Sequence, residues 1–561
     1  MEDIIRLFKS PATSLNPRPP AVDKDIATSN PTATYSSNVM RDKQLSSFEA
    51  LPSEIINHIL TFLPPVALCT LLCTSQLLRI HAHNDLLWSA FVRDNVPSAN
   101  KLESPSPAKS FKDVYIAHHP YWFLPRHKIW FSDLPNTGKI VIAQYNAKNG
   151  RIEAYQLVAE HNSHTFEAWT HNPEVLIHTF DPKVRVWKDD PVVLLDLKDN
   201  VPEKRLQKEV AMRTGSTHGV CSMISLCQPI PKELQDPSMG LWPPLIVPSE
   251  QRVRNESINL FKTEAHRPQS FDLMSDQTFR VRKWLEFSNI MQPLSSVRMG
   301  EQVMTFSTLP EELYTPTNEK PYQGLWVGDY SGHGCEFLLV LQREVYSSTK
   351  ICTEPSTGSL PEGVSLTHYE KETPEQRDAS IRHVIDDQDD EINVDDLQPD
   401  NALLSLMRGP MAENLERMNE PEDGYAGVSS STKPATSTKK TDQQAELPFT
   451  DDVPSGRLEA IKLTGDINVP RGEYTWIAED LGPNGLIRIG KEQIFDGARI
   501  VKSWGRIAGR GFRNNRFIPS QLILVSHDTI AQYWENFGHI SFYKRINIDD
   551  YLNAVDMSST S

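Results

Sequence analysis

Apolar positions follow two different periods along this chain. Between residues 51 and 63 they recur at helical spacing, and Pro64 and Pro65 then end one helix and begin the next. Further apolar groups at 68–72, 77–80 and 86–91 continue the helical pattern. Because three short helices bury too little surface to be very stable alone, we expect one face of this module to bind a partner.

From about residue 128, apolar positions instead alternate with polar ones. Segments 139–145 and 152–158 flank the turn NAKNG, which predicts a β-hairpin. The other candidate strands are 175–180, 184–187, 325–330, 336–341, 458–463, 474–478, 499–507, 521–525, 529–534 and 540–545. Because few long helical patterns separate them, we predict a small all-α module followed by a mainly antiparallel, barrel-like β domain.

Charge is distributed unevenly along the chain. The net charge is −16 over 561 residues, but residues 351–450 alone carry −13, which leaves −3 for the rest. A segment so acidic, with few aromatic residues, cannot bury enough apolar surface to fold. We therefore predict a long disordered acidic insertion within the β domain. Residues 1–46, rich in Pro, Ser, Thr and Asn, predict a disordered arm for the same reason.

Cysteine usage and hydropathy indicate a cellular compartment. The six cysteines include no C-x-x-C pair, which favours a reducing environment. The first residues do not have the pattern of a signal peptide, and no apolar run reaches the roughly 18–20 residues of a membrane span. We expect a protein of the cytoplasm, the nucleus or both, with no membrane partner.

The helical module resembles an F-box. The resemblance rests on Leu51-Pro52-x-Glu54, Ile59-Leu60, Phe62-Leu63-Pro64, Leu68, Ser75, Arg79 and Leu87-Trp88. In that family the motif docks on a Skp-type adaptor and thereby on a cullin–RING ubiquitin ligase. The resemblance implies that the adaptor-binding residues are Leu51, Pro52, Glu54, Ile55, Ile59, Leu60, Leu63, Pro64, Leu68 and Trp88. The alternative is an isolated helical bundle that only forms a core.

The β segments resemble one branch of the F-box-only proteins, the branch of the thirty-first member. The resemblance lies in GLWPP (240–244), GLWVGDYSGHGCEFLLVL (324–341), KLTGDINVP (462–470), RIAGRGF (506–512) and FYKR (542–545). It implies a C-terminal β-barrel that recognises substrate. The sequence departs from the expected pattern at Arg510, where His is expected, and at 527–532, where a more acidic and aromatic segment is expected.

Polar residues near two predicted turns are the candidate substrate-binding residues. They are His333, Glu336, Lys462, Thr464, Asp466 and Arg510. Polar groups at a barrel mouth can grip a peptide end, and the resemblance implies that these loops bind a short degron, possibly near a substrate C-terminus. The alternative is that Asp466 stabilises its own turn and that His333 is an ordinary turn residue.

Catalytic motifs are absent from the sequence. Residues 328–332 miss the G-x-S-x-G pattern by one position, and His333 and Glu336 lack the further ligands of a metal site. We therefore expect no enzyme activity, no metal and no cofactor. A basic run contains Arg499, Lys502, Arg506, Arg510, Arg513 and Arg516, but alternation on a strand would divide it between two faces, so nucleic acid is not the favoured partner.

These observations predict the following organisation. The expected segments are a disordered arm (1–46), the F-box (47–97), a helical connection (98–127), two parts of the β-barrel domain (128–345 and 456–550), the acidic insertion (346–455) and a tail (551–561). The predicted function is that of a substrate-recognition subunit of an SCF-type ubiquitin ligase, with a Skp-type adaptor and a protein substrate as partners. The alternatives are an F-box scaffold outside the ligase and a barrel that binds a small ligand or nucleic acid.

Overall fold

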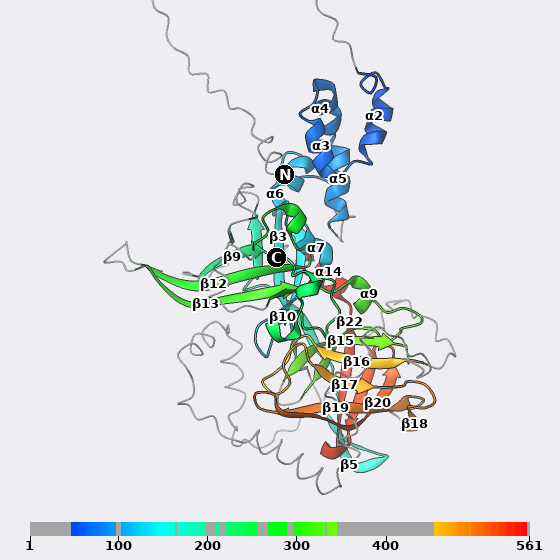
Figure 1. Cartoon of the computed structure of the whole chain (residues 1–561). Helices are drawn as coiled ribbons and strands as arrows, with labels where there is room; N and C mark the ends of the chain where they lie inside the picture. The colour runs from blue at the N-terminus through cyan, green and yellow to red at the C-terminus, as the bar shows by residue number, and fades with distance from the viewer. Residues whose placement is uncertain are drawn as a thin grey trace, which may run out of the picture.

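The computed structural model describes residues 46–96, 102–162, 165–196, 206, 209–212, 220–254, 267–288, 296–330, 334–344, 454–492 and 494–557. Almost all of the expected N-terminal arm and acidic insertion therefore lies outside the described residues. The described chain forms three layers, with helices above, an antiparallel sheet in the middle and a closed barrel below (Figure 1).

The helical layer confirms the helices expected from the apolar period. It contains α2 (Ser53–Leu60), α3 (Pro65–Leu71), α4 (Gln76–Ala82), α5 (Asp85–Asp94), α6 (Phe111–His118) and α7 (Phe123–His127). Pro64 precedes α3 in extended conformation, and the hydroxyl of Ser75 accepts the backbone N–H of Leu78 at 3.1 Å to cap α4. Helices α6 and α7 lie within the expected connection. Helix α6 packs onto α5, where the rings of Trp88 and Tyr115 are 5.7 Å apart, and α7 contacts β2.

The middle layer is a nine-stranded sheet with the order β6-β3-β2-β1-β13-β12-β9-β8, and β7 also pairs with β3. Its strands are β1 (Ile129–Ser132), β2 (Ile140–Asn146), β3 (Arg151–Glu160), β6 (Lys183–Trp187), β7 (Val193–Asp196), β8 (Val210–Met212), β9 (Val220–Leu226), β12 (Thr278–Ser288) and β13 (Ser296–Ser307). A small ribbon of β10 (Leu241–Trp242) and β11 (Val253–Arg254) accompanies it. Short 3₁₀ helices lie at Lys232–Leu234, Pro237–Met239, Phe271–Leu273 and Glu535–Phe537.

The lower layer is an eight-stranded antiparallel barrel, which confirms the predicted fold class. Its strands are β14 (Gly324–Asp329), β15 (Cys335–Arg343), β16 (Arg457–Lys462), β17 (Tyr474–Ala478), β19 (Arg499–Gly509), β20 (Arg513–Ser526), β21 (Thr529–Trp534) and β22 (His539–Ile546). The pairing of β14 with β22 closes the barrel. Strand β18 (Leu486–Ile489) pairs with β19, while β5 (Asn172–His178) adds to β22 in parallel and carries β4 (Phe166–Trp169) at its outer edge.

Of the strands that we assigned to the barrel before residue 345, only β14 and β15 lie in its closed ring. The earlier strands form the middle sheet, except for β4 and β5. The chain crosses between the two sheets at Asp181-Pro182, because β5 belongs to the barrel sheet and β6 to the middle sheet. Short helix α9 (Glu311–Tyr314) follows β13, and α14 (Ile548–Met557) follows β22.

Four apolar clusters lie among the described residues, and the three larger ones hold the layers together. The first joins the helices to the upper face of the middle sheet and includes Trp88, Trp130 and Phe306. The second joins the lower face of that sheet to the outside of the barrel, and the third fills the barrel interior. Alternation on β15 makes this division plain, since Leu339 belongs to the second core and Leu338 to the third. No helix among the described residues is long and apolar enough to cross a membrane.

Candidate protein-binding sites

The helical module leaves several large apolar side chains in contact with solvent. Leu51 is 36% exposed, Ile55 46%, Phe62 74% and Val66 42%. Helix α2 is amphipathic, and its buried face consists of Ile56 and Leu60, so Ile55 lies on the opposite side. These side chains would gain free energy if another protein covered them.

The predicted adaptor-binding residues divide into two groups in the structure. The exposed or half-buried ones are Leu51, Pro52, Glu54, Ile55, Ile59, Leu63 and Pro64. Leu60, Leu68 and Trp88 are fully buried, and the indole N–H of Trp88 donates to the carbonyl oxygen of Ala82 at 2.8 Å. In this conformation those three side chains hold the module together and do not face a partner.

Four exposed apolar residues are absent from the predicted set. Phe62, Val66, Ile80 and Leu86 all lie at the module surface, and Ile80 and Leu86 are 70% and 77% exposed. Helical phase was the signal that could have found them, because each is out of step with the buried positions of its own segment.

At one end of the barrel, three charged side chains meet in its interior. The ammonium group of Lys462, at the end of β16, lies 2.8 Å from Oε2 of Glu336 on β15 and 3.0 Å from Oδ2 of Asp466. It also lies 4.5 Å from the ring centroid of Tyr330, a cation–π distance. Glu336 and Lys462 are buried, and Asp466 is nearly so.

This group of three carries more negative than positive charge. Burial raises the pKa of Glu336 well above its ordinary value, and the negative charge of Asp466 raises it further, while Lys462 opposes both effects. One ammonium group cannot neutralise two carboxylates, and a buried negative charge that is not neutralised costs free energy. Protonation of Glu336, or a hydrogen-bond donor beside it, would lower that cost.

Asp466 also shapes the loop that follows β16. Its Oδ1 accepts the backbone N–H groups of Asn468 at 2.6 Å and Val469 at 2.7 Å. The hydroxyl of Thr464 accepts the N–H of Phe337 at 2.8 Å, which ties the same loop to β15. Loop 464–470 is therefore rigid, and Asp466 does stabilise its own turn, as one of our two alternatives proposed.

The neighbouring β19–β20 turn touches this loop. The side-chain amide of Asn468 donates to the carbonyl of Ala508 at 3.0 Å, and the N–H of Gly511 donates to the carbonyl of Ile467 at 2.9 Å. Arg510 is exposed on that turn, and Ile467 is exposed on the loop. At this rim, apolar Ile467 and cationic Arg510 both face solvent.

The structure brings together four of the six predicted substrate-binding residues. Glu336, Lys462, Thr464 and Asp466 form one contact group, Arg510 lies on the adjacent turn, and His333 lies outside the described residues. Our sequence reasoning missed the polar side chains deeper in the barrel. The hydroxyl of Tyr330 lies 2.8 Å from that of Thr475, and a second chain of hydrogen bonds links Tyr543, Gln532, Ser520 and Ser503.

The basic run does not form one exposed patch, but alternation is not the reason, because Lys502 and Arg506 are four residues apart on β19 and lie on the same face. Arg506 is partly buried and pairs with Glu473 at 2.8 Å, whereas Lys502, Arg510 and Arg513 are exposed. Within the described residues, no group of three or more His, Cys, Asp or Glu side chains fits a metal ion.

The structure thus joins a helical module that has uncovered apolar residues to a barrel with a polar end. In a comparison with family models, residues 48–94 match the F-box-like family. The chain therefore contains an F-box-like domain followed by a β-barrel.

The second match is more particular. Residues 306–550 match the family described as the Cyclin D1 binding domain, a stretch that begins at the end of β13 and includes all eight barrel strands. No curated protein matches the chain.

Proposed function

We propose that this protein is the substrate-recognition subunit of an SCF-type ubiquitin ligase. The observation that carries the proposal is the F-box-like domain with Leu51, Ile55 and Phe62 uncovered, fused to a barrel. F-box domains generally bind a Skp-type adaptor, and an apolar face of this kind gains free energy when a partner covers it. The adaptor would connect the chain to a cullin–RING ligase.

In this role the protein performs no chemistry itself. Holding a cargo protein beside a ubiquitin-charged enzyme replaces a rare encounter with a high local concentration. The arrangement of the layers supports this role, because the apolar core around Trp88 and Trp130 is shared by the F-box-like helices and the middle sheet. A shared core fixes the distance between adaptor and cargo.

The polar end of the barrel is our candidate for the cargo site. The match to the Cyclin D1 binding domain supports a protein cargo of the cyclin D type, recognised through a short segment. Because Lys462 is buried and already paired, we assign to Lys462, Glu336 and Asp466 the positioning of loop 464–470. Exposed Ile467 and Arg510 would then make the outer contacts with the cargo.

Two variants test the two sites separately. Replacing Leu51 and Pro52 by Ala should weaken adaptor capture about a hundredfold, since about 3 kcal/mol of apolar burial is lost, and should leave cargo capture unchanged. Asp466→Asn should do the reverse, because loop 464–470 loses its charged anchor. Pull-downs with a purified Skp-type adaptor, a cullin and a D-type cyclin measure both.

Matched controls separate these effects from general damage. Pro231 and Leu234 are an exposed Pro and Leu outside the F-box-like domain, and replacing both by Ala should preserve adaptor capture. Asp480 also accepts a backbone N–H from its own turn, that of Gly482 at 2.7 Å, so Asp480→Asn should preserve cargo capture. Adaptor capture by the Leu51/Pro52 variant at wild-type strength would contradict the F-box assignment. Adaptor without cullin would indicate a scaffold outside the ligase.

A further inference from the structure

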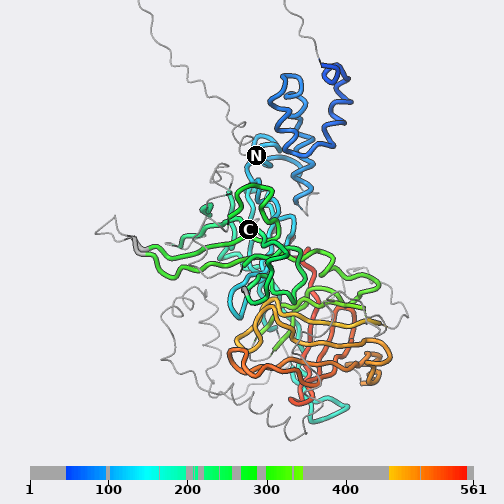
Figure 2. Tube along the Cα trace, in the orientation of Figure 1, coloured from blue at the N-terminus to red at the C-terminus, as the bar shows by residue number. Residues whose placement is uncertain are grey.

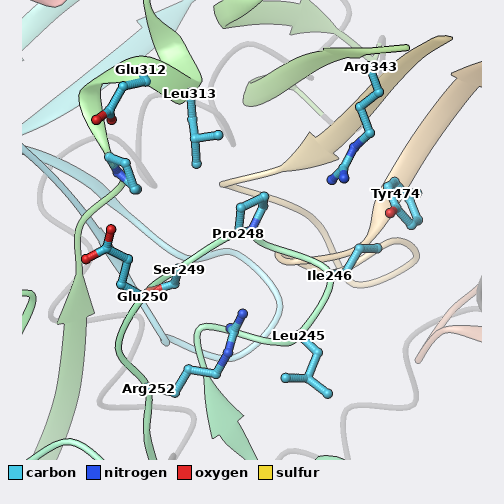
Figure 3. A pocket seen from close by; sticks show the side chains of 11 residues that line it. Leu245, Ile246, Pro248, Ser249, Glu250, Arg252, Glu312, Leu313, Arg343 and Tyr474 are labelled. Carbon is cyan, nitrogen blue, oxygen red and sulfur yellow. The ribbon is translucent and has the colours of Figure 1, made fainter. Parts of the chain in front are cut away.

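A cavity of about 530 Å³ lies between the β10–β11 loop and the outside of the barrel, away from both sites described above. Three segments line it: the loop that joins β10 to β11, the turn at α9, and the barrel residues Arg343 and Tyr474 (Figure 3). Its volume is in the range of sites for small molecules, which often lie between structural units.

The walls of the cavity are held in place by hydrogen bonds. The guanidinium group of buried Arg252 donates to the carbonyl oxygens of Pro243 at 2.6 Å, Pro244 at 2.8 Å and Val247 at 3.0 Å, which fixes the curve of the β10–β11 loop. On the other side, the amide of Gln323 donates to the carbonyl of Glu312 at 2.5 Å. The cavity is therefore preformed, and little binding free energy would be lost in ordering its walls around a ligand.

On the barrel side of the cavity, two arginine side chains share one carboxylate. Buried Glu459 pairs with two arginines, Arg343 at 3.0 Å and Arg457 at 2.8 Å. Both guanidinium groups are charged at any physiological pH, so one positive charge is left without a carboxylate in the described part of the chain. Figure 3 shows the Arg343 side chain directed into the cavity.

The other residues that line the cavity limit which ligands could neutralise the charge of Arg343. Ile246, Pro248 and Leu313 give the cavity an apolar surface. On the side away from Arg343, Glu250 and Glu312 present two carboxylates (Figure 3). These carboxylates repel a second acidic group, so a ligand with one anionic end and an apolar body fits, and a dicarboxylate does not.

We propose that this cavity binds a small amphipathic monocarboxylate, with its carboxylate on Arg343 and its apolar body along Ile246, Pro248 and Leu313. A bidentate contact between the two Nη groups of Arg343 and the carboxylate would complete the charge balance around Glu459. This site is independent of the ubiquitin-ligase proposal and of the barrel mouth.

The test is an NMR titration of the full chain with octanoate as the probe. A ligand of this size should bind with a Kd of about 1 mM. Octanamide, which is neutral, and octanedioate, which has a second carboxylate, should each bind at least about tenfold more weakly. Equal binding of octanamide, or no octanoate binding, would overturn the proposal.

Variants locate the binding site. Arg343→Met should weaken octanoate binding by about tenfold or more, and Arg343→Lys should retain part of it. Arg185 is another ion-paired arginine, on β6, and Arg185→Met should have no effect. If Arg343→Met fails to fold, the comparison of octanoate with octanamide on the wild-type chain still decides the matter. Unchanged octanoate binding by folded Arg343→Met would refute the site.

One competing occupant comes from the chain itself. The acidic segment 351–450 follows Arg343 closely in sequence and could supply its own carboxylates. Deleting 351–450 should leave octanoate affinity within about twofold of the full chain. Binding only after deletion would show that the chain's own segment fills the cavity and would overturn the proposal of an external ligand.

Discussion

Glu336 is a carboxyl group in the interior of a barrel, beside one ammonium and a second carboxylate. Its pKa is raised by burial and by Asp466, so in the folded state it holds a proton at pH values where the unfolded chain has lost it. Folding stability must therefore fall as pH rises from the ordinary Glu pKa toward the raised value, by about 1.4 kcal/mol for each pH unit of that interval.

Glu336→Gln removes this titration and keeps the shape of the side chain. We predict that the free energy of unfolding of the variant, relative to wild type, increases as pH rises from about 4.5, because only the wild type must ionise a buried acid. Urea unfolding of both proteins between about pH 4.5 and 8.5 measures the difference. A difference that stays constant with pH would show that Glu336 ionises as freely in the fold as in water.

At the scale of single strands, glycines decide how the barrel interior is filled. A Cβ on Gly505 of β19 would lie 2.3 Å from Cζ3 of Trp534, and one on Gly328 of β14 would lie 2.5 Å from the ring of Tyr543. These large rings occupy the space that a side chain would otherwise need. In the barrel, the ring of Trp534 therefore packs against Gly505 and the ring of Tyr543 packs against Gly328.

Gly505→Ala should destabilise the protein by about 1–3 kcal/mol, because the ring of Trp534 has to move to admit the methyl group. Lys502 lies on the same strand but is exposed, so Lys502→Ala should change stability by less than about 0.5 kcal/mol. Denaturant unfolding followed by tryptophan fluorescence compares the two. An equally mild effect of Gly505→Ala would mean that the interior is more loosely packed than described.

The local apolar period was enough to predict some helices and strands from the sequence, but not others. The helices α2 to α5 and most barrel strands have a clean apolar period, and the sequence predicted them. The long pair β12 and β13 was missed, because a register shift between Lys283 and Leu285 breaks the alternation of β12. Our adaptor-binding set also combined buried Leu60 and Trp88 with exposed Ile55, because it followed the resemblance and did not use helical phase.

Pairing between distant strands lay beyond sequence reasoning. Strand β1 pairs with β13, and β5 pairs with β22, so the division of strands between two sheets depends on contacts far apart in the chain. Glu336, Lys462 and Asp466 were chosen as polar residues beside two predicted turns, and the sequence did not predict that the three side chains meet. The structure supplies the physical cause of this contact, the pairing of β15 with β16 across the acidic segment.

At the scale of the whole molecule, the acidic segment 351–450 is inserted in the sequence between two strands, β15 and β16, that pair with each other. Residues 344 and 454 are the last and first described positions around it, and β15 and β16 on its two sides pair along six residue positions of the barrel. A loop inserted between paired strands costs mainly closure entropy, which rises slowly with length. We predict that deleting 351–450 preserves one cooperative thermal transition. Loss of that transition in calorimetry would assign the segment a structural role.

Shared apolar cores connect the helical layer to the barrel through the middle sheet. The helices and the middle sheet share one core, and the middle sheet and the barrel share another. Helices α6 and α7, which follow the F-box-like domain in the chain, contribute Phe111, Val114, Phe123 and Leu124 to the first core. If the proposed function holds, these shared cores would keep a cargo at a constant position relative to an adaptor.

The most direct test of the proposed function is ubiquitin transfer in a reconstituted system. The protein, a Skp-type adaptor, a cullin–RING ligase, a charged ubiquitin-conjugating enzyme and a D-type cyclin would be combined, and cyclin–ubiquitin conjugates measured over time. We predict conjugates with the wild type, and at least about tenfold slower formation both with the Leu51/Pro52 double Ala variant, which still binds cargo, and with Asp466→Asn, which still binds adaptor. Conjugates formed at the wild-type rate by either variant, or none by a fully assembled wild-type complex, would contradict the account.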